Sequence, residues 1–297
     1  MNKLIECVPN ISEGRRPEVV AECVGAVASV EGVKVLHFTS DYDHNRTVIT
    51  FVGEPEKVIE SAVRLCKKAS ELIDLRVHTG EHPRMGAVDV CPFIPVKNVS
   101  EDEIVEYAKT AGRRIWEEVN IPVYLYEKAA SAPHRVNLAD VRKGQFEGLA
   151  DKTALPEWQP DFGTSFHPSA GITIVGAREF LIAFNIELDT DDVEIAKKIA
   201  KTIRFSSGGY PCVKALGLML HKTNTAQVSI NFTDYKVTSL HTVVDKVREE
   251  AIKYGTTVKC TELIGLSPMK ALIESAAHYL KIKDFDYGKQ VFENHLI

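Results

Sequence analysis

The stretch from Leu75 to Val96 carries the side chains whose types and spacing are best suited to chemistry. It holds His78 and His82, two of the ten histidines of the chain, and its first half lacks helical or strand periodicity, which predicts a loop. Pro83 restricts the backbone of His82 and so aims its imidazole in one direction. An imidazole can take up and return a proton near neutral pH. The residues alone leave two interpretations of His82 open: a general acid/base, or a loop histidine hydrogen-bonded to the backbone.

The same loop contains residue types that can ligate a metal ion. His78, Glu81 and His82 are such types, but two histidines four residues apart converge on one ion when they lie on a helix. Gly80 and Pro83 disfavour a helix here. We therefore expect no metal site.

Four further polar residues are candidates for contacts with a small substrate. Arg46 and Arg84 each offer the planar set of donors that binds a carboxylate. Asn45 and Arg46 end a polar turn that begins at Asp41, and Asn10 stands in a turn after the first strand. Turn residues of these types are often only solvated or structural, so that interpretation stays open beside substrate contact.

A second candidate loop is small, hydroxylated and aromatic, and precedes the later half of the chain. Such a loop can bring backbone groups and a phenyl ring against a flat heteroaromatic ligand, and a linker between lobes is the alternative interpretation. Its residues are Gly163, Thr164, Ser165, Phe166, His167, Pro168, Ser169, Ala170, Gly171 and Ile172.

The composition is that of an ordinary globular protein. Of 297 residues, 44% are hydrophobic and 26% charged, which suits two lobes. The net charge of −5 argues against a nucleic-acid partner. We expect a cytoplasmic protein without a membrane partner, because there is no membrane-length apolar run, no signal-peptide core and no CxxC pair. The absence of a P-loop, of GxGxxG after a strand and of GxSxG disfavours an NTPase, a dinucleotide oxidoreductase and an α/β-hydrolase.

Hydrophobic periodicity predicts a similar order of elements in the two halves of the chain. A capping box of Ser100 and Glu103 marks the start of one helix, and two prolines are expected to break the strand that ends at Val96. The predicted strands are 3–8, 33–39, 47–52, 87–96, 122–127, 172–175, 180–188, 213–220, 225–232 and 258–263, and the predicted helices are 17–30, 54–73, 100–118, 137–146, 191–203, 241–254 and 268–280. We expect strands 172–175 and 180–188 to pair around a turn at 176–178.

This order predicts an α+β fold with two ferredoxin-like α/β subdomains. Their expected ranges are 1–180 and 181–297, with a substrate groove between them.

Four motifs resemble the glutamate formiminotransferase family. They are CVPNISEG at 7–14, NRTVITFVG at 45–53, GEHPRMGAVDVCPFIPV at 80–96 and GAREFLIAFNIEL at 176–188. The resemblance covers nearly the whole chain in the right order, and the chain looks like the stand-alone bacterial form without a cyclodeaminase. It implies a formiminotransferase N-terminal and C-terminal subdomain and, as in the family, a homodimer.

The resemblance also implies a reaction and its residues. N-formimino-L-glutamate and tetrahydrofolate are the expected substrates, with tetrahydrofolate as co-substrate, and the formimino group passes to N5 of the folate in histidine degradation. The family's catalytic histidine falls on His82, and its folate-binding loop falls on residues 163–172. Two alternatives stay open: a folate one-carbon enzyme that acts on 5-formyltetrahydrofolate, and a non-catalytic folate-binding protein.

Overall fold

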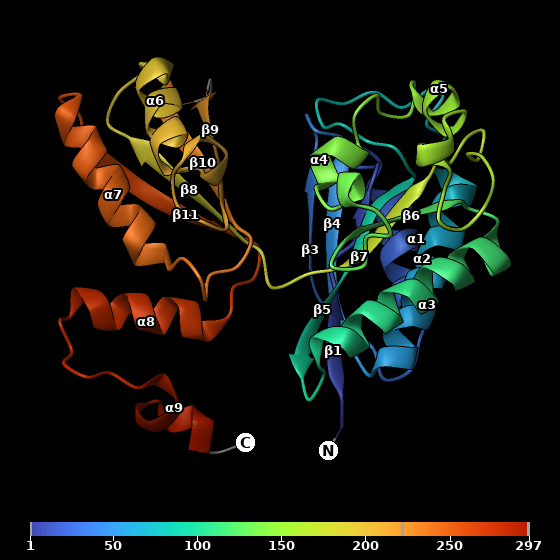
Figure 1. Ribbon diagram of the computed structural model, residues 1–297, viewed down its shortest axis with the longest axis horizontal. Coiled ribbons are helices and arrows are strands. Elements are labelled where there is room, and N and C mark those ends of the chain that lie inside the picture. Colours follow the sequence, from blue (N-terminus) through green and yellow to red (C-terminus); the bar gives the residue numbers. More distant parts are fainter. Residues whose placement is uncertain (1, 221–222, 296–297) are drawn as a thin grey trace. The chain divides into compact units, whose positions relative to one another are not determined.

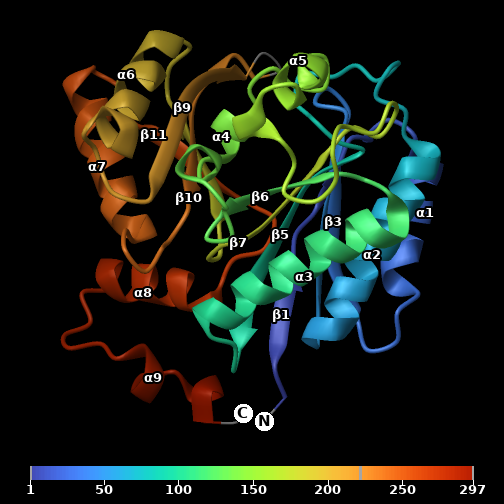
Figure 2. The ribbon, with the colours of Figure 1, turned by 45° about the vertical axis from the view of Figure 1, so that its right-hand side comes forward.

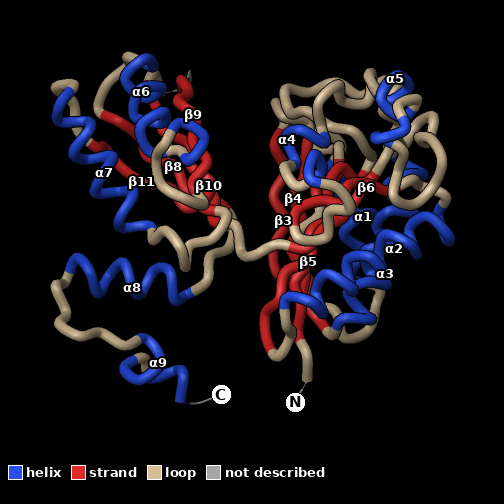
Figure 3. Tube along the Cα trace, in the orientation of Figure 1, coloured by secondary structure: helices blue, strands red, loops and turns tan. Residues whose placement is uncertain are grey.

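The protein is described by a computed structural model over residues 2–220 and 223–295. Its contacts divide the chain into two units, residues 1–178 and 179–297, each with its own sheet and its own core. Figure 3 shows that helices and strands form separate layers within each unit. We describe each unit by itself.

Unit 1 alternates strands and helices along the sequence (Figure 1). Its elements are β1 (Leu4–Cys7), β2 (Asn10–Ile11), α1 (Pro17–Ala28), β3 (Lys34–Asp41), β4 (Arg46–Gly53), α2 (Pro55–Leu72), β5 (Val88–Lys97), α3 (Glu101–Val119), β6 (Val123–Glu127), the 3-10 turn η1 (Pro133–Arg135), α4 (Leu138–Val141), α5 (Leu149–Thr153), η2 (Pro156–Trp158) and β7 (Thr173–Ala177).

The seven-stranded sheet of unit 1 extends a ferredoxin-like half. Strands β1 and β2 both lie between β4 and β5 and pair antiparallel with each, and β3 pairs with β4. This gives the order β3-β4-β1-β5 for the β-α-β-β-α-β part of the chain. Strand β7 then pairs parallel with β5, and β6 pairs parallel with β7. Parallel strands need long crossovers, which α3 and the segment that follows β6 provide.

Helices α1, α2 and α3 cover one face of this sheet (Figure 2). Helix α3 starts where the capping box was predicted, because Glu103 N donates to Ser100 Oγ at 3.2 Å and Ser100 N donates to Glu103 Oε2 at 2.9 Å. Large apolar side chains such as Phe51 and Phe93 are fully buried between the helices and the sheet. The layer forms the main core of unit 1.

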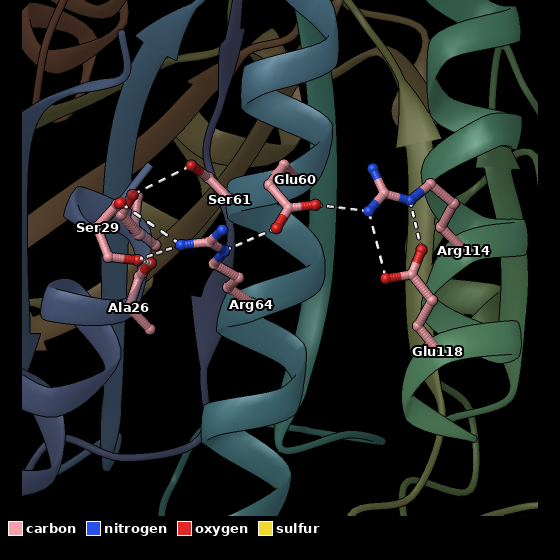
Figure 4. A network of polar contacts seen from close by, with 8 residues as sticks. Ala26, Ser29, Glu60, Ser61, Arg64, Arg114 and Glu118 are labelled. Atoms are coloured by element: carbon pink, nitrogen blue, oxygen red, sulfur yellow. Dashed lines mark hydrogen bonds and ion pairs between the residues drawn. The ribbon is translucent and has the colours of Figure 1, made fainter. Parts of the chain in front are cut away.

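A network of polar contacts joins the outer surfaces of these three helices (Figure 4). Arg114 on α3 donates to Glu60 on α2 and to Glu118. Arg64 donates to Glu60 Oε1 at 2.7 Å and to the Ser29 hydroxyl, just after α1, at 2.9 Å. Each arginine of the network therefore has at least one carboxylate partner.

Part of the opposite face of the sheet is covered by α4, α5 and their connecting turns. A smaller apolar cluster forms there, with Tyr124 and Tyr126 of β6 fully or nearly buried. Lys152 of α5 donates to the carbonyls of Val141 and Lys143, the last turn of α4 and the residues after it. This cover brings the segment around residues 142–147 against the predicted histidine loop.

Unit 2 is a four-stranded antiparallel sheet with helices packed on it. The order β11-β8-β10-β9 is that of a ferredoxin-like β-α-β-β-α-β unit. Strand β8 alternates buried and partly exposed residues along its length, as expected for a strand with one face on a core. Its elements are β8 (Ile182–Leu188), α6 (Val193–Ile203), η3 (Phe205–Ser207), β9 (Val213–Leu220), β10 (Thr225–Phe232), α7 (Leu240–Lys253), β11 (Val258–Ile264), α8 (Met269–Tyr279), α9 (Tyr287–Gln290) and η4 (Phe292–His295).

The predicted fold class, α+β with two ferredoxin-like subdomains, is confirmed. The groove expected between the subdomains stays a prediction. No helix in the described part of the chain is long and apolar enough to cross a membrane.

Three local predictions were wrong. Strands β7 and β8 do not pair with each other: Gly176 and Ala177 continue β7 next to β5 and β6, and β8 belongs to the other sheet. The helix expected at 137–146 ends at Val141, because Gly144 and Gln145 have positive φ. Strand β5 is not broken by its prolines; Pro92 lies opposite the break between β1 and β2, where its carbonyl accepts from Val8 N.

Candidate active site

Two loops of unit 1 lie side by side: the histidine loop, residues 74–87, and the second loop, residues 163–172. Leu75 N donates to Ser169 O at 2.8 Å, and Ala87 N donates to Ala170 O at 2.9 Å. Gly171 makes the close approach possible, since its φ is +70° and an added Cβ would lie 1.9 Å from the Met85 carbonyl oxygen. The two loops predicted separately from the sequence are thus hydrogen-bonded to each other.

His82 contacts Arg46, at the start of β4. Arg46 Nη1 lies 2.7 Å from His82 Nε2. A guanidinium has only donors, so Nε2 must accept this bond with its lone pair. The ring also hydrogen-bonds the backbone of Pro83, which has no amide hydrogen, so the ring donates there. His82 is therefore the neutral tautomer that carries its hydrogen on Nδ1.

The surroundings of His82 strongly favour its neutral form. Burial is the largest cause, and the nearby charges of Arg46, Arg142 and His44 act in the same direction, so the pKa of His82 falls to about 3. A neutral imidazole can accept a proton, which is the first task of a general base.

Two of the basic side chains around His82 lie against carboxylates. Arg142 donates to the buried Asp89, whose other oxygen accepts from Met85 N at 2.8 Å. His44 Nδ1 lies 2.9 Å from Asp41 Oδ2, and the rings of His44 and His82 meet edge to face at 6.2 Å. Arg46 differs, because within residues 2–220 and 223–295 it forms no ion pair with a carboxylate. Arg46 is also half-buried, and burial is the first cause that lowers its pKa.

His78 is held on both ring nitrogens. Its Nε2 lies 3.1 Å from the carbonyl oxygen of Asn45, and its Nδ1 accepts from Arg84 Nε at 3.2 Å. Burial comes first among the causes that lower the pKa of His78. With both nitrogens engaged, His78 fixes the shape of the loop.

Asn45 connects three segments around the site. Its side chain accepts from Gly14 N at 2.9 Å and donates to the Thr79 carbonyl at 2.8 Å, and its φ is +50°. Asn10 has only a local contact, from Nδ2 to the Val8 carbonyl at 3.3 Å. The structure thus gives Asn45 a structural task at the site, and substrate contact by either asparagine stays a prediction.

Arg84 is buried and already paired. Its guanidinium donates to both carboxylate oxygens of Glu147, at 2.6 and 2.8 Å, and to Gln145 at 3.3 Å. Substrate contact by Arg84 stays a prediction, and this fork would have to open for it.

The second loop is partly shaped by its own side chains. Ala170 N donates to His167 Nδ1 at 3.0 Å, and Phe166 packs edge to face on Phe146 with 6.3 Å between ring centroids. Thr164 and Ser165 are exposed. A ligand on this loop would therefore meet backbone and hydroxyl groups more readily than the Phe166 ring.

A cavity of about 300 Å³ adjoins the histidine loop on the side of His78. Glu13, Arg15, Asp74 and Thr79 are among the residues that line it, and His82 is not. Arg15 donates to the Tyr42 carbonyl at 2.9 Å and stacks over the Tyr42 ring. The cavity is therefore a neighbour of the His82 site and not part of it.

No group of three or more histidine, cysteine or acidic side chains in the described ranges is placed to hold a metal ion. Sequence reasoning missed Asp89, Arg142 and Glu147, which surround the histidine loop. Asp89 stood within the stretch first singled out, but a lone acid in a strand gives no signal of its partner. Arg142 fell in a segment interpreted as helix, and Glu147 followed that segment directly.

Comparison with known proteins identifies the class of this fold and site. The model of the formiminotransferase domain, N-terminal subdomain, matches residues 4–178, and that of the formiminotransferase domain matches residues 183–293. The chain therefore belongs to the formiminotransferase family.

Individual relatives are similar over most of the chain. It is 50% identical to the glutamate formimidoyltransferase of Streptococcus pyogenes serotype M1, over 100% of both chains. It is 45% identical to the glutamate formimidoyltransferase of Thermoplasma acidophilum, over 96% of this chain and 95% of that protein. It is 48% identical to the formimidoyltransferase-cyclodeaminase of Rattus norvegicus, over 94% of this chain and 53% of the rat protein.

Proposed function

We propose that this chain transfers the formimino group of N-formimino-L-glutamate to N5 of tetrahydrofolate, giving 5-formiminotetrahydrofolate and L-glutamate. Full-length similarity to proteins named glutamate formimidoyltransferase carries the proposal. The site supports it with a neutral imidazole, His82, next to Arg46, which has no carboxylate partner in the described ranges. An imidazole can move protons, and a guanidinium can bind a glutamate carboxylate.

His82 is the proposed general acid/base. N5 of tetrahydrofolate attacks the amidine carbon, and a tetrahedral intermediate with a new N5–C bond forms. His82 takes the proton from N5 and returns it to the glutamate nitrogen as the old C–N bond breaks. One proton thus moves from N5 to the departing amine, and the imidazole ends neutral as it began.

Holding two substrates in one place contributes as much as proton transfer does. The reaction is bimolecular, and orientation of the two reactants removes much of its entropic barrier. Arg46 is the proposed contact for a glutamate carboxylate. Asn10, Asn45 and Arg84 are weaker proposals, because the last two already have protein partners.

The second loop, residues 163–172, is the proposed folate contact. Its exposed Thr164 and Ser165 offer hydroxyl groups, and its backbone is hydrogen-bonded to the histidine loop. A folate held there would lie beside the loop that carries His82. Tetrahydrofolate, as co-substrate, supplies the nucleophilic N5, and the chain supplies proton transfer and positioning.

A donor panel tests the proposed reaction. The full chain is incubated with tetrahydrofolate and N-formimino-L-glutamate, and separately with 5-formyltetrahydrofolate, while the absorbance of the folate is followed. We expect turnover with the first donor. Turnover with the formyl compound alone would replace the proposed reaction by another folate one-carbon reaction, and folate binding by calorimetry without turnover would indicate a binding protein.

We propose a cytoplasmic homodimer with two subdomains, residues 1–180 and 181–297. The division of contacts after Arg178 supports the boundary, and exposed Leu216 and Leu218 on β9 give apolar surface that permits association. Light scattering measures the oligomeric state, and a monomer at assay concentration would contradict the proposed homodimer.

A further inference from the structure

The contact between Arg46 and His82 blocks the atom that the proposed reaction needs. Nε2 of His82 accepts from Arg46 at 2.7 Å, and the ring hydrogen is used at the Pro83 backbone. Nε2 is therefore not available to a substrate proton while the contact lasts. In this structure the proposed base, His82 Nε2, is therefore already hydrogen-bonded to Arg46.

Three basic side chains from three parts of unit 1 act on His82, and they are not equivalent. Arg46 of β4, His44 of the β3–β4 turn and Arg142 after α4 all disfavour the imidazolium. Asp89 of β5 neutralises Arg142, and Asp41 of β3 is paired with His44. Arg46 has no carboxylate partner in residues 2–220 and 223–295, so it is the cation that a new anion would engage.

We propose that a carboxylate of the donor substrate draws Arg46 away from His82 and thereby switches the histidine on as a base. This inference rests on the proposed function, because it takes the donor to be a glutamate derivative. The Arg46 guanidinium exchanges a neutral imidazole partner for an anion, which is the stronger hydrogen-bond acceptor. Arg46 then binds the donor carboxylate directly and affects proton transfer through His82.

The exchange changes the base strength of His82 as well as its access. A bound carboxylate offsets the charge of Arg46, so the imidazolium is no longer destabilised by it and the pKa of His82 rises. By linkage, donor binding and protonation of His82 favour each other. A neutral amidine without a carboxylate would leave Arg46 in place and would be a poor donor.

The proposal is tested by NMR on the full chain labelled with ¹⁵N-histidine. The signals of His82 are assigned with His82→Gln, and the pH is varied without ligand, with saturating L-glutamate and with neutral glutaramide. We expect glutamate to raise the pKa of His82 by about one unit or more, and glutaramide to leave it unchanged. A His82 signal that does not respond to saturating glutamate would overturn the proposal.

Two variants of Arg46 locate the effect in the guanidinium. In Arg46→Gln the pKa of His82 should already be raised without ligand, and glutamate should add nothing. Arg46→Lys keeps the cation and its ability to donate but loses the planar fork of the guanidinium, and should retain a reduced shift in the pKa of His82. An unchanged pKa of His82 in Arg46→Gln would contradict the proposal, and Arg64→Gln on α2 serves as the matched arginine control.

Kinetics separate this role from simple support of the fold. In Arg46→Gln we expect KM for N-formimino-L-glutamate to rise about 10- to 100-fold and the acidic limb of kcat/KM to move to higher pH. If kcat/KM of Arg46→Gln were instead lower than that of the wild type by the same factor at every pH, the role of Arg46 would be structural and the proposal would be overturned. Because the NMR test needs only L-glutamate, a shift in a chain without transferase activity would refute the proposed function alone, whereas active transfer with an unresponsive His82 would refute this inference alone.

Discussion

Unit 1 contains two polar clusters built from similar residues, and they differ in how their arginines are paired. On the helix layer, Arg114 reaches two carboxylates, those of Glu60 and Glu118 (Figure 4). The other cluster, here called the loop end, consists of His82, Arg46, His44 with Asp41, and Arg142 with Asp89. There Arg46 contacts the neutral ring of His82 and, within residues 2–220 and 223–295, forms no ion pair with a carboxylate. An arginine that already pairs with carboxylates stabilises the fold but is poorly placed to bind a substrate anion. A half-buried guanidinium without a carboxylate partner retains affinity for an anion. The difference between the two clusters therefore indicates where a substrate carboxylate would bind.

The largest expected effect separates the two histidines of the loop. We expect His82→Gln to lower kcat by about 10²- to 10⁴-fold, because general acid/base catalysis is lost. His78→Gln should lower kcat by less than about 10-fold, since His78 supports the loop through Asn45 and Arg84 and moves no substrate proton. Steady-state kinetics on both variants measure the contrast. Equal losses would show that the loop end acts as a structural unit, and the assignment of His82 would fail.

The buried pair at the loop end should matter more for stability than any pair on the helix layer. Asp89→Asn leaves Arg142 without its carboxylate, and breaking a buried pair is expected to cost about 3 kcal/mol in the free energy of unfolding. Both tryptophans, Trp116 and Trp158, lie in unit 1, so urea unfolding followed by their fluorescence reports on it. Glu106→Gln, which removes an exposed pair on α3, is the control and should leave the urea midpoint unchanged.

The contact between the two loops can be tested at one glycine. Gly171→Ala should destabilise unit 1 by about 2 kcal/mol, because the new Cβ overlaps the Met85 carbonyl and the backbone must move. Gly32→Ala has a similar φ of +89° with only the flexible Lys57 side chain 4.0 Å away, and should cost about 1 kcal/mol. The same fluorescence measurement compares the two variants. Equal costs would mean that the loops do not meet at Gly171.

Acid should weaken unit 1 through the loop end. The folded-state pKa of His82, about 3, lies below its unfolded value, so the unfolded chain binds more protons at intermediate pH. The resulting stability is complete above the unfolded pKa near 6.5 and is lost as the pH falls toward about 3. Between pH 7 and 5 we expect a loss of about 2 kcal/mol in the free energy of unfolding, which His82→Gln removes. An identical pH dependence in the variant would contradict the buried neutral state.

The smallest effect is expected on the helix layer itself. Arg114→Gln removes contacts with Glu60 and Glu118 that are partly exposed to solvent, and such pairs contribute less than about 1 kcal/mol. Formimino transfer should be unchanged, because the network does not contact the histidine loop. A large loss of activity would show that the two clusters are coupled.

The sequence predicted what local interactions determine. The start of α3 is determined by the capping box of Ser100 and Glu103, two residues only three positions apart. Pro83 likewise indicated the histidine loop through its effect on its neighbour His82. The partners of β7 and β8 were not predictable, because each strand pairs with segments far along the chain and either pairing satisfies its apolar pattern.

The same holds for the site: a residue was predictable from its neighbours in sequence, but its contacts with residues far along the chain were not. His82 could be singled out by its neighbours and by family resemblance. Its contact with Arg46 joins residues 36 positions apart, and the pair of Arg142 with Asp89 joins residues 53 apart. No spacing rule links such residues, so the pairing state of each arginine became visible only in the folded chain.

The most direct test is a crystal structure of the chain with tetrahydrofolate and L-glutamate bound together. We predict that N5 of the folate lies within hydrogen-bond reach of His82 Nε2, about 3 Å, and that a glutamate carboxylate accepts from Arg46. A folate whose N5 lies far from His82, with Arg46 still on the imidazole, would contradict the assignment of the active site.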